Sequence, residues 1–323
     1  MKNSNIFTSP HWHDTNENKS NLVATASLNL HVKNMLGGRI AEMSGEPIIQ
    51  YNDLAVTNDE NSNILQAEIL PKLEQNKIDL LYFRNVRSDS YLFQQIKNIG
   101  KIIAYKKAPF INLSQFTNLD EYLKSLSSTS RKSKRRTLKK LKTKFQVEFE
   151  TLVDDQINAA LFDQIIQLKK DQLKRMGLTS RLFENPAKIN DLKNIILKPN
   201  KDFQCVFSLL KCDGKIAAAE IGYLFNDTYY SFLGAMDEAF QAHSPGVCQL
   251  LKTIEWAIEH KIKIFDFLAP EDAYKFSWTD NLYVEVYDFI LPLSFKGKII
   301  GNAYLRILRP LLKKIFLFAK TRK

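Results

Sequence analysis

The chain of 323 residues is long enough for two domains, or one double domain with a real hydrophobic core. Its 45% hydrophobic content and net charge of +11 come with three scattered cysteines and no CxxC or His/Cys spacing, which argues against a disulfide framework and a structural zinc site. The chain shows neither a signal-peptide core nor an apolar run of spanning length, so we expect a cytoplasmic protein or one held at the inner-membrane surface.

The N-terminal third begins with a polar segment and continues with a mixed pattern. Residues 1–20 are rich in Asn and poor in apolar periodicity, so they are expected to form a separate segment. Residues 21–120 are expected to form the first domain. In it, residues 78–85 read as a strand, 90–100 as a helix and 102–113 as a second strand.

A dense run of cations follows. Residues 122–147 contain no acid, and nine Lys and Arg residues lie between Arg131 and Lys144. Leu138, Leu141 and Phe145 share one helical face, which predicts an amphipathic helix docked by that stripe. Its charged faces are either simply solvated or clamp an anion such as CoA phosphates, a tRNA end, an acidic polymer or lipid headgroups. The candidates for such a clamp are Arg131, Arg135 and Arg136. Nucleic acid as a main partner is disfavoured, because no reading module is present.

The next elements alternate in type. Residues 145–152 read as a strand, whereas 155–176 and 186–197 read as helices. Three strands at 205–210, 215–225 and 229–235 are then expected to pair antiparallel. Asp213-Gly214 and Asn226-Asp227 supply the turn signals between them.

The stretch 229–278 begins with the last of these strands and continues with a turn, a helix and a parallel strand around one loop. Ser244, Pro245, Gly246 and Val247 form the loop, and the helix that they open leads to a short apolar strand at 262–268. Helix-opening amides can bind an anion such as a pyrophosphate, and a side chain at Gly246 would keep a ligand off the backbone. His243 beside the loop could reach the ligand, or it could have only a surface or capping role.

Several segments together resemble a known family. YYSFLGAMDEAF at 229–240, HSPGVCQLL at 243–251, FDFL at 265–268 and AYKFSW at 273–278 are similar to the GNAT-type acyltransferase domain of the CelD/BcsL group, and more distantly to Fem-type aminoacyl ligases. The basic helix and GEPIIQYNDLAV at 45–56 add to the resemblance, which covers about 37–293. It implies an α/β fold with a GNAT-like mixed sheet flanked by helices, in a tandem arrangement with a shortened N-terminal half. The acyltransferase domain would then be 121–300.

The resemblance also implies chemistry. The donor would be an acyl-CoA, with acetyl-CoA favoured and no metal, and the acceptor a sugar or amine in exopolysaccharide, cellulose or envelope synthesis. Tyr274 could protonate the leaving thiolate and Lys275 could hold an anion, or both could be packing and surface residues. Glu220 in an apolar strand and Asp266 at a strand end could face the cleft, or they could lie on a wet face or cap a turn.

The chain ends in a basic amphipathic segment at 301–323. Its part 304–323 could lie in an anionic headgroup interface, or it could pack as a helix on the domain. Two alternatives to an acyl-CoA-dependent enzyme stay open: a Fem-like transferase that takes its acyl group from aminoacyl-tRNA, and a non-catalytic binding module of a polysaccharide synthase system.

Overall fold

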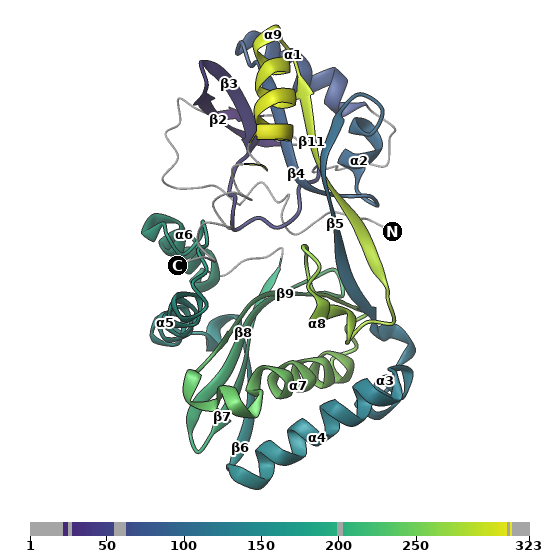
Figure 1. The fold of residues 1–323 in the computed structure, drawn as a ribbon, viewed down its shortest axis with the longest axis vertical. Coiled ribbons are helices and arrows are strands. Elements are labelled where there is room, and N and C mark those ends of the chain that lie inside the picture. Colours follow the sequence, from purple (N-terminus) through teal and green to yellow (C-terminus); the bar gives the residue numbers. More distant parts are fainter. Residues whose placement is uncertain (1–21, 25–27, 55–62, 199–202, 309–310, 312–323) are drawn as a thin grey trace. The chain divides into compact units, whose positions relative to one another are not determined.

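The computed structural model describes residues 22–24, 28–54, 63–198, 203–308 and 311, and the described chain forms two compact units (Figure 1). One unit contains the described residues up to Lys107 and those from Val284 onward, and the other is Ala108–Tyr283. The sequence placed a boundary near residue 120 and kept 284–300 in the second domain, whereas those residues fold with the first unit. The predicted segment 1–20 lies outside the described residues.

The first unit is a mixed sheet with helices on both faces. Strands β1 and β2 are antiparallel, as are β2 and β3, whereas β4 is parallel to β3 and antiparallel to β11. The strands, in sheet order, are β1 (Leu22–Ala24), β2 (Asn29–Met35), β3 (Gly38–Met43), β4 (Leu80–Arg87), β11 (Tyr283–Pro292) and β5 (Lys101–Asn112), which continues into the second unit. The helical segments are η3 (Leu65–Ile69), α1 (Leu70–Gln75), α2 (Tyr91–Ile96), α9 (Phe295–Ile299) and η7 (Ile300–Leu308).

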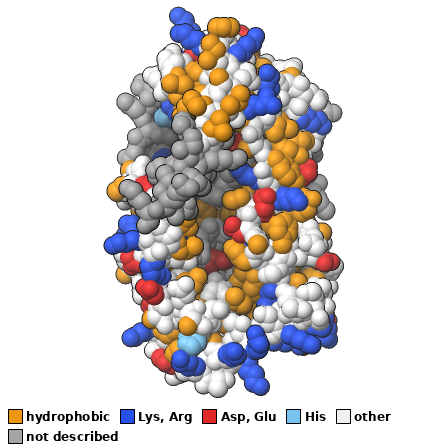
Figure 2. Space-filling model, viewed as in Figure 1, with side chains coloured by type: hydrophobic (Ala, Val, Ile, Leu, Met, Phe, Trp, Pro, Cys, Tyr) orange, Lys and Arg blue, Asp and Glu red, His pale blue; other side chains and the backbone are white. Residues whose placement is uncertain are grey.

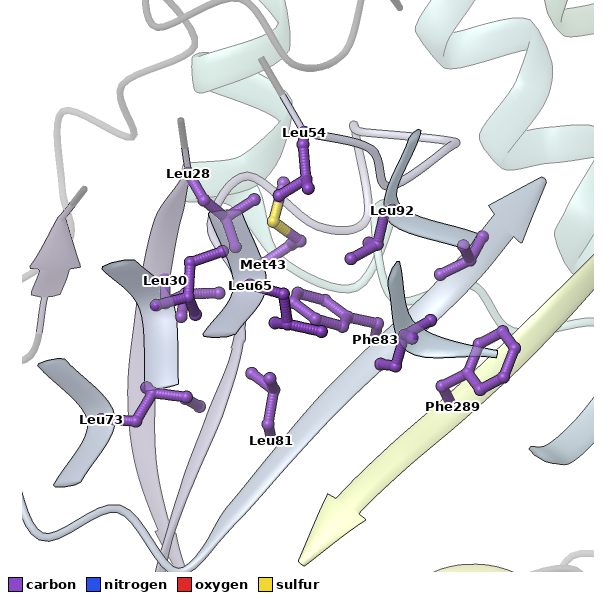
Figure 3. Packing of buried hydrophobic residues seen from close by; sticks show 14 of the residues in the cluster. Leu28, Leu30, Met43, Leu54, Leu65, Leu73, Leu81, Phe83, Leu92 and Phe289 are labelled. Atoms are coloured by element: carbon purple, nitrogen blue, oxygen red, sulfur yellow. The ribbon is translucent and has the colours of Figure 1, made fainter. Parts of the chain in front are cut away.

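The two faces of β4 explain why its first half, Leu80–Phe83, is an apolar run. Leu81 and Phe83 belong to the larger core, which η3, α1 and α2 close and of which Figure 3 shows the packing. The alternate residues Leu80 and Tyr82 pack with Ile300 of η7 on the other face. Because both faces of this strand are covered, its side chains do not alternate between apolar and polar.

The second unit is also a mixed sheet between helices. Its sheet order continues from the end of β5 through β10, β9, β8, β7 and β6. The strands are β6 (Val147–Val153), β7 (Gln204–Cys212), β8 (Lys215–Phe225), β9 (Thr228–Met236) and β10 (Ile264–Asp266). The helical segments are η4 (Leu113–Gln115), α3 (Leu119–Ser125), α4 (Ser128–Lys144), η5 (Asp154–Gln156), α5 (Ala159–Arg175), α6 (Pro186–Leu197), η6 (Glu238–His243), α7 (Pro245–Glu259) and α8 (Ala273–Phe276).

The hairpins β7–β8 and β8–β9 turn where the sequence predicted. Asp213-Gly214 and Asn226-Asp227 all have positive φ, between 46° and 75°, as a two-residue type I′ turn requires. Leu210 of β7 packs with Cys248 of α7, whereas the adjacent Leu209 lines a cavity of about 480 Å³ with Leu161 and Leu168 of α5. Since neighbouring strand residues point to opposite faces, α7 and α5 cover opposite faces of this sheet.

Candidate functional site

The parallel strands β9 and β10 pair over only three residues. Ile264, Phe265 and Asp266 are opposite Thr228, Tyr229 and Tyr230, after which β10 ends and β9 continues to Met236. The register between β8 and β9 also shifts. Ile221 is opposite Leu233 and Gly222 is opposite Ser231, so Phe232 of β9 is an extra residue. The strands therefore separate at their carboxyl ends, the end at which α7 begins. The predicted strand 262–268 is shorter than expected, because Leu268 turns the chain with a φ of +60°.

Glu220 lies on β8 next to this separation. Its carboxylate accepts hydrogen bonds from the Tyr229 hydroxyl at 2.7 Å and from the Ser231 hydroxyl at 2.9 Å. Burial raises the pKa of Glu220 from 4.5 to about 7, although both hydrogen bonds favour the charged form. Gly222 makes the arrangement possible, because a Cβ there would stand 2.3 Å from the Tyr229 hydroxyl.

Tyr274 on α8 belongs to the same site. Its side chain is 56% exposed, and its pKa is raised to about 12 by partial burial and by the negative charges of Glu220 and Asp272. The negative charge of Glu220 thus contributes to the raised pKa of the phenol. The sequence predicted both residues as candidates but gave no sign that they act on each other.

Lys275 and Asp266, the other two catalytic candidates, hold the loop between β10 and α8. The Lys275 ammonium is buried and donates to the carbonyl oxygens of Leu268 at 2.9 Å and Pro270 at 2.7 Å. The buried Asp266 carboxylate accepts a 2.7 Å hydrogen bond from the Leu268 N–H. In this arrangement both side chains support the turn that carries Tyr274.

Helices α3 and α4 hold the residues that follow Tyr274. Lys134 of α4 is buried, donates to the Ser277 carbonyl at 2.8 Å and lies 4.0 Å from the centre of the Trp278 ring. The Tyr122 hydroxyl of α3 donates to the Trp278 carbonyl at 2.6 Å. Burial lowers the pKa of Lys134 to about 8. The sequence analysis treated Lys134 as one cation among many, yet its spacing of four and seven residues from Leu138 and Leu141 places it on the apolar stripe.

The loop before α7 has the geometry of a helix start. Ser244 has a φ of +51°, its carbonyl accepts from the Val247 N–H at 3.1 Å, and Pro245 occupies the first helical position. A Cβ added to Gly246 would meet no described atom within 4 Å. The Gly246 backbone therefore borders open space at the amino end of a fifteen-residue helix.

The cations nearest to this helix start come from the end of α4. The Lys144 ammonium lies 3.2 Å from Nε2 of His243, whose ring packs edge-on against Phe145. Lys142 acts electrostatically on Cys248 in the first turn of α7. The cations predicted from sequence, Arg131, Arg135 and Arg136, lie nearer the start of α4, and the contact of Lys144 with His243 depends on the tertiary fold.

The three arginines that the sequence analysis chose have other surroundings. Arg135 forms a 2.7 Å ion pair with Asp120, and Arg131 donates to the Lys124 carbonyl at 3.3 Å. Arg136 is exposed. Neither of these two contacts involves the loop before α7.

The first unit repeats the parallel strand–helix–strand order. Strands β3 and β4 are joined through η3 and α1 and also pair over three residues. Beyond them, the buried Arg84 guanidinium lies 2.7 Å from Glu42, forms a second ion pair with Glu46 and stands 4.8 Å from the Tyr82 ring centre. In the first unit these charges therefore pair with one another, and the site described above belongs to the second unit.

Comparison with known proteins agrees with this topology. Residues 128–276, from the start of α4 to the end of α8, match the family model described as the acetyltransferase (GNAT) domain. The matched stretch lies within the second unit and covers less than half of the chain. No curated protein matches the sequence.

Solved structures resemble the chain in fold at low identity. The C-terminal domain of a protein assigned as a lysylphosphatidylglycerol synthetase from Agrobacterium fabrum is 11% identical with a TM-score of 0.59, covering 87% of this chain and 86% of that one. FemX is 13% identical with a TM-score of 0.56, covering 88% and 89%. A conserved protein from Bacteroides thetaiotaomicron is 13% identical with a TM-score of 0.56, covering 84% and 85%. The GNAT-like α/β fold expected from the sequence is confirmed.

Among the residues that the structure describes, no helix combines the length and apolar character needed to cross a bilayer. Within the same residues, no group of three or more His, Cys, Asp or Glu side chains could hold a metal ion.

Proposed function

We propose that the chain is an acyltransferase that takes an acyl group from acyl-CoA, with acetyl-CoA as the favoured donor, and transfers it to an amine or hydroxyl acceptor. The observation that carries this proposal is the buried Glu220 carboxylate, which the Tyr229 and Ser231 hydroxyls hold beside the separated strands. Near neutral pH the Glu220 carboxyl, with a pKa of about 7, is partly charged and can accept a proton, whereas the Tyr274 phenol, with a pKa of about 12, keeps the proton that it would donate.

The donor phosphates would bind at the start of α7. Its amino-terminal partial positive charge and the open Gly246 backbone suit a pyrophosphate. Lys142 and Lys144 would add charge from α4, with His243 beside them. The edge of β9 beyond Tyr230 is unpaired with β10 and would hydrogen-bond an extended donor arm in the manner of an added strand.

The transfer step needs two proton movements. The acceptor nitrogen or oxygen attacks the thioester carbonyl carbon while Glu220 takes its proton. The carbon–sulfur bond then breaks, and the departing thiolate receives the phenolic proton of Tyr274. Solvent returns a proton to Tyr274 and removes one from Glu220, so the cycle closes without an enzyme-bound acyl group.

The proposal extends to the acceptor and the pathway. The resemblance to the CelD/BcsL group is the basis for a sugar or amine acceptor in exopolysaccharide, cellulose or envelope synthesis. A transferase that uses aminoacyl-tRNA is the second candidate. It is favoured by the exposed cations along the whole of α4, a seventeen-residue helix, which is longer than one pyrophosphate requires.

Donor binding tests the proposal directly. Isothermal titration with acetyl-CoA, longer acyl-CoAs and uncharged tRNA would identify the donor class. Gly246→Val should fold, because the added side chain meets open space, but it should weaken CoA binding by about tenfold or more by keeping the phosphates off the backbone. A folded Gly246→Val protein with unchanged CoA affinity would remove the loop from the donor site. A wild-type protein that binds neither CoA nor tRNA would support a non-catalytic module.

A further inference from the structure

The helix formed by α9 and η7 exposes apolar side chains along its outer side. Phe295 is 77% exposed, Ile299 53% and Ile307 57%, and they recur at intervals of four and eight residues. Leu308 and Leu311 continue the exposed apolar surface at 48% and 51%. Figure 2 shows hydrophobic side chains gathered over α9, with Lys and Arg side chains beside them. A contiguous apolar stripe of this kind is rare on a free surface.

The inner side of the same helix is firmly docked on the first unit. Ile300 and Leu305 are buried in a cluster with Ile40 and Leu80. Gly297 approaches the Asp79 carbonyl so closely that a Cβ would stand 1.8 Å from its oxygen. The outer stripe is thus a second apolar face on an anchored helix, which is expected of a helix that has a partner on both sides.

The charged side chains of the helix itself have one sign, whereas the Asp79 carboxylate beside its start accepts from the Ser294 hydroxyl. After Asp288 the sequence contains no Asp or Glu up to residue 323, and Lys296, Lys298 and Arg306 are all exposed. A second copy of the chain, placed symmetrically on the stripe, would bring these cations face to face. An anionic surface complements them instead, and apolar residues between cations are typical of helices in the headgroup region.

We propose that this outer face, defined by Phe295, Ile299 and Ile307 with Lys296, Lys298 and Arg306, docks on the surface of an anionic lipid bilayer. The apolar side chains enter the boundary between headgroups and acyl chains, and the cations contact lipid phosphates. The sequence placed an interfacial segment at 304–323, most of which lies outside the described residues, whereas the exposed stripe already begins at Phe295. The inference does not depend on the proposed chemistry of the second unit.

Vesicle co-sedimentation of the full chain tests the proposal. Vesicles of equal parts phosphatidylcholine and phosphatidylglycerol should bind the wild-type protein well, whereas pure phosphatidylcholine should bind it weakly. Lys296→Gln with Lys298→Gln should lower binding roughly 30-fold, because each cation near an anionic surface contributes about fivefold. The triple variant Phe295→Ser, Ile299→Ser, Ile307→Ser should lower it at least as much.

The matched control uses exposed apolar residues of the second unit, Met176 and Leu178, which are 61% and 50% exposed. Met176→Ser with Leu178→Ser should leave vesicle binding unchanged. Circular dichroism and CoA titration check that every variant folds and binds as the wild type does. Equal binding by wild type and triple variant would overturn the proposal. So would a vesicle-free dimer, seen by light scattering, that the triple variant dissociates, because the stripe would then bind a second copy.

Discussion

The Tyr229 hydroxyl donates a 2.7 Å hydrogen bond to Glu220, and the ring of Tyr229 stacks on Phe265 with 4.7 Å between centroids. The first contact connects β8 to β9, and the second connects β9 to β10. The buried carboxylate is thereby fixed to all three strands at the place where β9 and β10 begin to separate. The position of Glu220 thus depends on the same residues that shape the proposed donor site.

Glu220→Gln should remove the general base while keeping the shape of the side chain. We expect the transfer rate to fall by about 10²-fold to 10⁴-fold and acetyl-CoA affinity to stay near the wild-type value. Thiol release with a responsive acceptor measures the rate, and calorimetry measures the affinity. A variant with the wild-type rate would show that another group takes the proton.

The same substitution has a stability signature. Native Glu220 keeps its proton up to a pKa of about 7, whereas the unfolded chain releases it near 4.5. The unfolded state therefore binds fewer protons between these values, and the wild-type free energy of unfolding should fall as pH rises from about 4.5 to 7. Glu220→Gln should lose this component of the pH dependence. Parallel pH curves for the two proteins, measured by urea unfolding, would contradict the assigned burial.

Tyr274→Phe should lower the rate of the chemical step by about 10²-fold and leave CoA affinity nearly unchanged, since only the proton donor is lost. Tyr105→Phe is a matched control, because Tyr105 is a similarly exposed tyrosine, at 46%, in the first unit. Stopped-flow thiol release separates chemistry from product release. Full activity in Tyr274→Phe would exclude the phenol as the acid.

Lys134→Met should free the turn after Tyr274, because the bond to the Ser277 carbonyl is lost. Misplacement of the acid by even a small distance should lower kcat by roughly tenfold or more, with KM for the donor little changed. Buried Lys134 has a native pKa of about 8, below its ordinary 10.5, so the wild-type protein should gain stability as pH rises between those values. Lys134→Met should lack that gain. A normal kcat in this variant would limit Lys134 to packing.

The end and the middle of α4 should differ in their effect on the donor. Lys142→Gln with Lys144→Gln should weaken CoA binding several-fold at low salt and flatten its salt dependence, because these cations lie by the start of α7. Arg135→Gln with Arg136→Gln is the control for an equal loss of charge in the middle of the helix. Equal weakening by both pairs would indicate a diffuse field, and weakening by the arginine pair alone would favour the clamp expected from sequence.

Local signals in the sequence were sufficient for most elements of the second unit. The hairpin turns at Asp213-Gly214 and Asn226-Asp227 and the helix start at Pro245 follow from short-range backbone preferences. The site depended on longer-range facts. Residue type did not reveal that Lys275 faces backbone carbonyls or that Lys134 contacts Trp278. A lysine on a helix looks the same in the sequence whether its ammonium group meets solvent or another loop. The division of the chain was equally non-local, since β11 pairs with β4 across almost two hundred residues.

The chain enters and leaves the second unit side by side, because the Phe110 N–H donates to the Leu282 carbonyl at 3.1 Å. The second unit is thus an uninterrupted stretch inserted into the first, whose strand β11 is synthesised only afterwards. On the ribosome, the inserted unit can complete its sheet first, while β4 waits for its partner. A nascent chain stalled before Tyr283 emerges should therefore expose an unpaired edge of β4, and this interval is when the protein is most open to chaperone binding and aggregation.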